Sequence, residues 1–379
     1  MDLHANDWTA MSKANDQVLA DLFKVAEQEG SCLVSDDPAI RALLNRRVSS
    51  GSVVRPMRSL FARPEYWHAL RPDQQALHIV RGLQKLHPDM VFCHETAGLV
   101  WGLPISYPRL ATIHVATTLE KRRRSEGSIA RHIVGDDVQV VDGITVTPLA
   151  RTTFDCLRTS PFTEGLAIAD RALALSGSNR RAMHAAFREF GTHRLGINRA
   201  IGIMSYADPR SESWLESAAR ALMITQGFAL PDLQVELPRP DDPQRTYRVD
   251  YLWTLPGGSK VIGEADGISK YNDNAFGLGR STIQILADEQ HREAELTLYG
   301  APILRISPED VLKPQQFVDK LTRYGIPRSE RVATEIKRLA SVSPQSKLTY
   351  TEVAVSQETI EGFLRTQQLW NGTQLEDRA

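Results

Sequence analysis

Three carboxylates lie close together in the stretch YRVDYLWTLPGGSKVIGEADGISKY, residues 247–271. Asp250 lies in its first half. Glu264 and Asp266 lie in its second half, with one residue between them. If the two halves pair as antiparallel strands, Asp250 lies opposite Glu264, and Asp266 follows on the same side. Converging carboxylates repel one another unless a cation neutralises them or one of them keeps its proton. The stretch therefore predicts a site that binds a cation.

The residues around these acids predict a β-hairpin. Residues 255–259, LPGGS, form a turn, because proline presets one φ and glycine admits positive values. Residues 260–265 form the second strand. The alternative is an edge hairpin whose acids face solvent. Residues 247–253 form an alternating first strand, with four apolar side chains expected on one face: Tyr247, Val249, Tyr251 and Trp253.

The neighbouring segments predict the elements that hold this hairpin. Residues 211–226 form a helix in which Glu216 and Arg220, four residues apart, share one face. The simplest interpretation of these two residues is an ordinary ion pair. Gln234 begins a short strand. The remaining elements are a helix over residues 280–298, a strand over residues 301–306 and a short capped helix from Ser307, which gives the order α-β-β-β-α-β.

This order resembles the PD-(D/E)XK nuclease superfamily, and is most similar to the branch of the very-short-patch repair endonuclease. Asp250 matches the first acid of the motif, although Val249 replaces the usual proline. The triplet formed by Glu264, Ala265 and Asp266 matches the (D/E)-X-K element, with aspartate in the place of lysine. The very-short-patch branch also lacks lysine there.

The resemblance extends to residues outside the motif. Glu216 matches the acid of the first helix and Gln234 the glutamine of the first strand. Glu289 and Arg292 match a polar pair on the following helix. Lys270, four residues after Asp266, is the candidate for a relocated lysine.

The resemblance implies Mg²⁺- or Mn²⁺-dependent hydrolysis of DNA phosphodiesters. Asp250 and Glu264 would bind the ion directly, because hard cations prefer oxygen ligands, and the carbonyl of Ala265 would add another oxygen. Asp266 would bind a second ion or orient the attacking water. Lys270 would stabilise the charge of the transition state.

The N-terminal region has residues suited to binding DNA. Residues 41–63 contain six arginines and no acid. A helix over residues 16–29, a second helix over residues 39–48 and two short strands predict a winged helix-turn-helix, which inserts its second helix into the major groove and places its wing on phosphates. The alternative is a helical packing module with solvated arginines. The expected DNA contacts are Arg41, Asn45, Arg46, Arg47, Arg55 and Arg58.

This N-terminal order resembles the AbiEi-family antitoxins, the DNA-binding partners in type IV toxin–antitoxin systems. The matching segments are the helix over residues 39–48, the wing over residues 52–62, HETAGLVWGLP at residues 94–104 and TPLART at residues 147–152. The resemblance implies double-stranded DNA as a partner, and a cognate toxin or a second copy of the chain as protein partners. Three functions therefore stay open: an endonuclease of phage defence or repair, a transcriptional regulator or antitoxin whose nuclease-like domain is inactive, and a nucleic-acid-binding scaffold with a toxin partner.

The 379 residues have a formal net charge of −1 and predict an α+β protein of several domains. We expect a winged helix-turn-helix over residues 1–70, an α+β middle domain over residues 71–205, an α/β restriction-endonuclease-like domain over residues 206–312 and a helical extension over residues 313–379.

Cysteine, histidine and apolar patterns complete the prediction. The three cysteines are widely spaced, which indicates a reducing compartment. No apolar run reaches membrane-spanning length and residues 1–13 lack a signal-peptide core, so we expect a cytoplasmic protein without a membrane partner. The basic run at residues 121–124 is expected to be a solvated loop. Three histidines lack a partner at metal-ligand spacing and are expected to be structural or surface residues: His94, His114 and His132.

Overall fold

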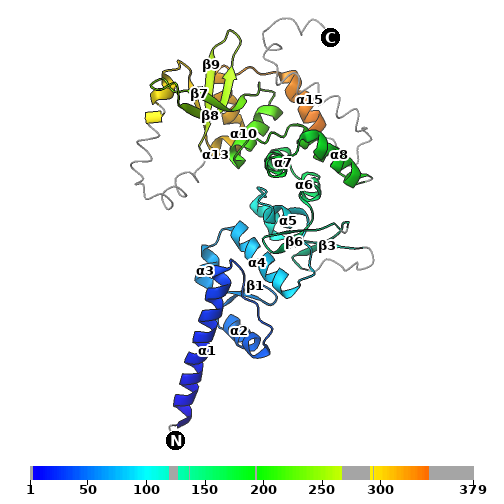
Figure 1. Ribbon diagram of the computed structural model, residues 1–379, viewed down its shortest axis with the longest axis vertical. Coiled ribbons are helices and arrows are strands. Elements are labelled where there is room, and N and C mark those ends of the chain that lie inside the picture. The colour runs from blue at the N-terminus through cyan, green and yellow to red at the C-terminus, as the bar shows by residue number, and fades with distance from the viewer. Residues whose placement is uncertain are drawn as a thin grey trace. The chain divides into compact units, whose positions relative to one another are not determined.

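A computed structural model describes residues 3–118, 127–135, 137–192, 194–266, 291–292 and 294–340. The chain is a mixed α and β protein, as the sequence predicts at this level, and it divides into two compact units, Met1–Asp155 and Cys156–Ala379 (Figure 1). No helix of the described ranges is both long and apolar enough to cross a membrane. Several predictions lie outside the described residues: Lys270, Glu289, the basic run at 121–124 and the part of the helical extension after residue 340.

The first unit begins with helices α1 (Leu3–Gln28) and α2 (Pro38–Ser49) and the antiparallel pair β1 (Val54–Met57) and β2 (Leu60–Ala62). Helix α2 begins where the sequence predicts, because Asp37 Oδ1 accepts a hydrogen bond from Ala39 N at 2.7 Å. Helix α1 begins earlier than the predicted residue 16. The core of this part joins α1, α2 and β2 through Leu19, Phe23, Ala26, Leu33, Leu44, Val53 and Phe61.

The rest of the first unit surrounds a second core. Phe92 bridges to both Val115 and Val146, so it links a parallel strand pair to an antiparallel one. The helices are α3 (Pro64–Ala69), α4 (Pro72–Leu86), α5 (His94–Val100) and the 3₁₀ helix η1 (Tyr107–Ala111), and helix α6 (Leu149–Leu157) runs across the boundary into the second unit. The strands are β3 (Ile113–Thr117) with β4 (Ile129–Ile133), and β5 (Gln139–Val141) with β6 (Ile144–Val146).

The second unit contains a four-stranded sheet with the order β10-β9-β8-β7. Strands β8 and β9 form the predicted hairpin and occupy the centre of this sheet, so the alternative of an edge hairpin with solvent-facing acids is wrong. The strands are β7 (Asp232–Pro238), β8 (Thr246–Thr254), β9 (Lys260–Ala265) and β10 (Ile303–Ile306). The helices are α7 (Phe162–Ser176), α8 (Arg180–Gly191), α9 (Ile197–Ser205), α10 (Trp214–Thr225), α13 (Pro308–Leu312), α14 (Pro314–Arg323) and α15 (Glu330–Ala340).

The expectation that one face of β8 carries all four apolar residues is wrong. Tyr251 and Trp253 belong to a large core with helix α10, whereas Tyr247 and Val249 pack in a separate core with Leu252, Ile262 and Leu296. The alternation reverses at Asp250, opposite Gln234, whose φ of 52° lies outside the β region. A glutamine gives no sequence signal for this conformation.

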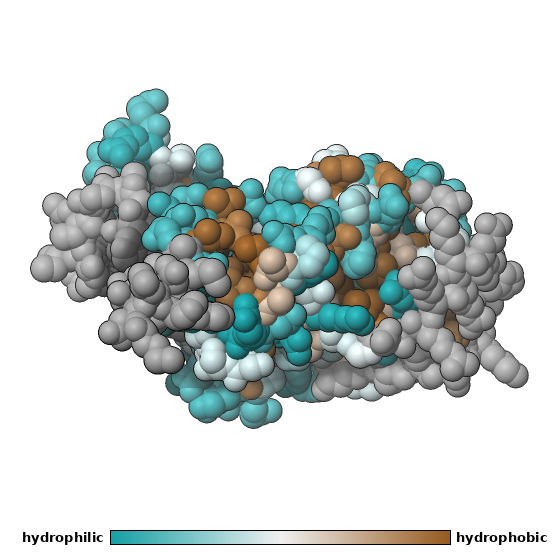
Figure 2. All heavy atoms as spheres, turned by 90° about the horizontal axis from the view of Figure 1, so that it is seen from below, coloured by the Kyte–Doolittle hydropathy of each residue, from teal (hydrophilic) through white to brown (hydrophobic). Residues whose placement is uncertain are grey.

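Exposed hydrophobic residues are scattered over the described elements. The face drawn in Figure 2 carries hydrophobic residues in separate patches among hydrophilic ones. The most exposed large hydrophobic side chains are Leu312, Leu298 and Val140, which lie on different elements. Such scatter is normal for a protein surface and marks no single binding face.

Candidate functional site

Three side chains from α10, β7 and β8 meet through one amide group. Gln234 Nε2 donates to Glu216 Oε2 at 3.0 Å and to Asp250 Oδ1 at 3.3 Å. Asp250 Oδ2 accepts a hydrogen bond from the backbone N–H of Ala265 at 2.8 Å. The register that pairs Tyr251 with Gly263, continued by one residue, sets Asp250 opposite the buried Glu264. We call Glu216, Gln234, Asp250 and Glu264 the carboxylate cluster.

Burial and mutual repulsion both act on this cluster. Glu216 is only 6% exposed, and burial raises the pKa of its carboxyl, with the charge of Asp250 acting in the same direction. Gln234 Oε1 is buried and has no hydrogen-bond partner among the described residues. The cluster therefore contains a buried carboxyl whose ionised form is disfavoured, and a buried amide oxygen without a hydrogen-bond donor among the described residues. Both are features of a site that can receive a cation or a water molecule.

Glu216 does not behave as the simple helical ion pair that its spacing from Arg220 allowed. Arg220 lies 3.6 Å from Asp170 and also donates to the carbonyl of Tyr206. The carboxylate of Glu216 accepts instead from Gln234 and from the backbone N–H of Glu212 at 2.9 Å. The helix therefore directs this acid to the hairpin.

Arginines already neutralise two of the acids. Glu264 Oε1 accepts from Arg292 Nη2 at 2.7 Å, and Asp266 Oδ1 accepts from Arg305 Nη1 at 2.8 Å. Arg248 pairs with Glu212 at the surface, whereas Asp250 accepts its hydrogen bonds from Gln234 and Ala265. Among the described residues, no three carboxylates have ligand atoms within 4.8 Å of one another.

The predicted DNA-contacting residues lie on α2 and the β1–β2 hairpin. All but one of them are exposed: Arg41, Asn45, Arg46, Arg55 and Arg58. Arg47 is half-buried and pairs with Asp16 of α1. The exposed arginines have the charge and position that contact with phosphates requires.

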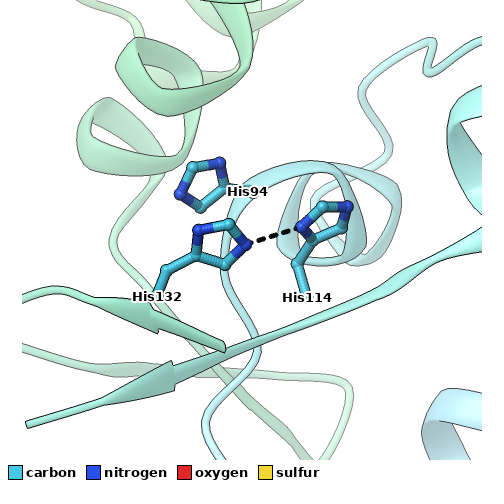
Figure 3. Close-up of side chains that lie close together, drawn as sticks. All are labelled: His94, His114 and His132. Carbon is cyan, nitrogen blue, oxygen red and sulfur yellow. Dashed lines mark hydrogen bonds between the residues drawn. The ribbon is translucent and has the colours of Figure 1, made fainter. Parts of the chain in front are cut away.

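The expectation that three histidines of the first unit lack a metal-ligand partner is wrong. His94, His114 and His132 offer nitrogen atoms that all lie within 4.8 Å of one another (Figure 3). We call these residues the histidine cluster. His114 Nδ1 and His132 Nε2 are 2.8 Å apart, and the rings of His94 and His132 stack with centroids separated by 3.8 Å.

Acidic side chains stand behind the histidine cluster. Glu95 Oε2 lies 3.3 Å from His114 Nε2, and Asp155 Oδ2 lies 3.9 Å from His94 Nε2. Arg109 pairs with Glu95, and Arg151 Nε donates to Asp155 at 2.6 Å. Burial lowers the pKa of His114, which favours the neutral imidazole.

The chain is similar to two proteins of Mycobacterium tuberculosis. Uncharacterized protein MT2308 of strain CDC 1551 / Oshkosh and Uncharacterized protein Rv2248 of strain ATCC 25618 / H37Rv are each 30% identical to it over 289 residues. The match covers 75% of this chain and 96% of each relative. The chain belongs to the family of these mycobacterial proteins. No protein-family model matches it, and no solved structure matches it significantly.

Membership of this mycobacterial family gives no activity, because the names of both relatives state none. A short sequence motif indicated the carboxylate cluster. The sequence offered no such signal for the histidine cluster, whose members come from α5, β3 and β4 and meet only because β3 and β4 pair.

Proposed function

We propose that this protein is a metal-dependent DNA endonuclease with an N-terminal winged helix that binds double-stranded DNA, acting in phage defence or repair. One observation carries the proposal. Gln234 joins Glu216 to Asp250 by two hydrogen bonds at the point where Asp250 lies opposite Glu264. The order of α10 and the β7–β9 strands supports a PD-(D/E)XK-like fold for residues 206–312.

The donor atoms of the carboxylate cluster fit Mg²⁺ or Mn²⁺. Asp250 and Glu264 supply hard oxygen ligands, and the carbonyl of Ala265 is the proposed third. The unused Oε1 of Gln234 and the raised pKa of Glu216, whose ionised form a nearby cation would stabilise, support cation binding at this cluster. When bound, the ion would neutralise charge on the phosphodiester and acidify a bound water.

The chain's own residues have separate roles in this proposal. Gln234 and the N–H of Ala265 hold the two oxygens of Asp250 in fixed directions. Arg292 pairs with the buried carboxylate of Glu264. Asp266 is proposed to bind a second ion or to orient water, and Lys270, outside the described residues, to stabilise transition-state charge.

Arginines of the first unit support the DNA-binding part. The exposed Arg41 and Arg46 on α2 and Arg55 and Arg58 on the β1–β2 hairpin would contact phosphates on either side of a major groove. Two other arginines of this region form ion pairs with acids: Arg47 with Asp16, and Arg63 with Glu27.

Plasmid cleavage tests the proposal. Supercoiled DNA is incubated with Mg²⁺ or Mn²⁺ and the wild type, Asp250→Ala or Glu264→Gln. Glu236→Gln is the control, because Glu236 is an exposed acid of β7 outside the cluster. We expect each cluster variant to lose more than about 100-fold in rate, with the control unchanged. Equal rates in all four proteins would rule out this site.

A second candidate function is a transcriptional regulator or antitoxin with an inactive nuclease-like domain, working with a cognate toxin or as a homodimer. The arginine partners of Glu264 and Asp266 favour it, because they occupy acids that a nuclease needs for metal. A footprint upstream of the protein's own gene without cleavage of that DNA would support this second candidate.

A further inference from the structure

We propose that His94, His114 and His132 together bind one transition-metal ion, for which Zn²⁺ is the first probe. This inference does not depend on the proposed nuclease activity, because the histidine cluster shares no residue with the carboxylate cluster. The site would be a second metal centre with a different metal preference. Imidazole nitrogen suits zinc and similar transition metals, whereas carboxylate oxygen suits Mg²⁺ and Mn²⁺.

Strand pairing brings two of the histidines to one face. His132 of β4 lies opposite Ala116 of β3, and Ala116 is two residues from His114 on the same strand. Because side chains alternate along a strand, His114 and His132 project from the same side of the β3–β4 pair. His94, the first residue of α5, stacks on His132 from outside the pair (Figure 3).

The spacing of the nitrogen atoms suits one small ion. A tetrahedral zinc ion with Zn–N bonds of about 2.0–2.1 Å needs ligand nitrogens about 3.3 Å apart. The nitrogens of His114 and His132 are 2.8 Å apart, and all three ligand atoms lie within 4.8 Å. Small side-chain rotations therefore suffice to give three ligands, with a fourth position left for water or an external ligand.

The outer contacts match those of histidines that bind metals. His114 turns Nδ1 toward His132, and its other nitrogen, Nε2, lies 3.3 Å from Glu95 Oε2. A carboxylate behind the distal nitrogen orients a ligand histidine and makes it a better donor. Glu95 is itself buried and held by Arg109, so its position is fixed before any ion enters.

The backbone of His94 gives an independent indication. Its φ is 50°, in the left-handed region that residues other than glycine rarely adopt. Two of the other three such residues in the described ranges, Ser59 and Asp142, lie in turns, and the third is Gln234 of the carboxylate cluster. Strained backbone at a folded site is typical of side chains that must point in one direction.

The alternative is a metal-free network in which His114 and His132 share one proton. Both arrangements use the same contacts, and they differ in whether the protein takes up one ion. His94 is buried, whereas His114 and His132 are half-buried, so solvent and ions can reach the cluster from their side.

Zinc uptake by the tag-free full-length protein tests the proposal. The protein is dialysed against EDTA, and the metal bound at equilibrium is measured by mass spectrometry after addition of Zn²⁺. The absorption of added Co²⁺ reports the geometry of the site. We expect one equivalent of zinc, a tetrahedral Co²⁺ spectrum, and a loss of affinity of more than about 100-fold in His114→Gln and in His132→Gln.

Two further variants sharpen this test. His68→Gln is the control, because His68 is an exposed histidine of α3, and it should bind like the wild type. Glu95→Gln should weaken binding by about 10–100-fold, as expected for a group behind a ligand. The proposal is overturned if the wild type binds no more zinc than the His114→Gln/His132→Gln double variant, or if His68→Gln loses the ion equally.

A measurement on the wild type alone covers the case in which a histidine variant does not fold. Zinc should raise the melting temperature of the wild type, with saturation at one equivalent and reversal by EDTA. An equal concentration of Mg²⁺ should not reproduce the increase. A melting temperature that zinc leaves unchanged would also overturn the proposal.

Discussion

The carboxylate cluster and the histidine cluster differ in how the fold balances their charge. Asp250, Glu264 and Glu216 are acids that repel one another, and arginines from outside the hairpin supply the neutralising charge, as Arg292 does for Glu264. The histidines can be neutral, and the fold places acids behind them. We therefore expect the carboxylate cluster to lose stability when a neutralising cation is removed, whereas the histidine cluster can stay neutral without one. This difference predicts how each responds when a partner is removed.

The largest expected effect is at Arg292. Arg292→Met removes the guanidinium that pairs with the carboxylate of Glu264, which is 2% exposed, so the free energy of unfolding should fall by about 3–4 kcal/mol in metal-free buffer. Mn²⁺ should restore part of this loss, since a metal ion can replace the guanidinium. Urea unfolding with and without Mn²⁺ measures both effects.

Two matched variants decide whether burial is the cause. Arg248→Met removes a surface ion pair with Glu212, whose side chain is half exposed, and should cost less than about 1 kcal/mol. Adding Glu264→Gln to Arg292→Met should recover much of the stability. Equal losses in Arg292→Met and Arg248→Met would contradict the view that the carboxylate cluster needs a cation.

A third acid tests the same principle away from both clusters. Asp170 of α7 lies 3.6 Å from Arg220, and burial raises its pKa from 3.8 to about 6. The folded chain therefore binds more protons than the unfolded chain between these values, so the stability that protonated Asp170 contributes is lost as pH rises through about 6. Relative to the wild type, Asp170→Asn should gain roughly 2–3 kcal/mol between pH 4 and pH 7.

Urea unfolding of both proteins across this range measures the difference. Burial also lowers the pKa of His184 to about 4, so its stabilising contribution is lost as pH falls below 6.5. That opposite trend is common to the wild type and Asp170→Asn and cancels when they are subtracted. A difference that stays constant with pH would show that Arg220 holds Asp170 ionised throughout.

The sequence predicted the parts of the molecule that depend on neighbouring residues. Alternation and the turn at Gly257 and Gly258, both with positive φ, gave the hairpin, and the helix predicted over residues 39–48 matches α2 to within one residue at each end. The structure also joins Glu216, Gln234 and Asp250, three of the residues singled out from the sequence, by hydrogen bonds.

The features that could not be predicted from the sequence depend on contacts between distant residues or on unusual backbone conformations. The histidine cluster arises from the parallel pairing of β3 with β4, which no local pattern specifies. The change of face at Asp250 lies opposite Gln234, whose positive φ is unusual for a residue with no special preference for it. The sequence was therefore informative about motifs and silent about two strained residues, His94 and Gln234, one in each cluster.

The smallest expected effect measures that strain directly. At an ordinary strand position, glycine is less stable than alanine by about 0.5–1 kcal/mol. At Gln234 and His94 the order should reverse, because alanine at a φ near +50° costs about 1 kcal/mol that glycine does not. Urea unfolding of the glycine and alanine variants at each position, in EDTA, gives the difference, and Glu236 of β7 serves as the ordinary position.

Comparing glycine with alanine removes the side chain in both variants, so lost hydrogen bonds cancel and the backbone term remains. A reversal at both positions would mean that each cluster holds one side chain in place at the expense of backbone stability. A reversal at Gln234 alone would mean that the backbone at His94 relaxes without cost, which would remove one of the supports for a preformed histidine site. If the order reverses at neither position, the positive φ has no measurable cost at either cluster. Only the side-chain contacts would then support the two sites.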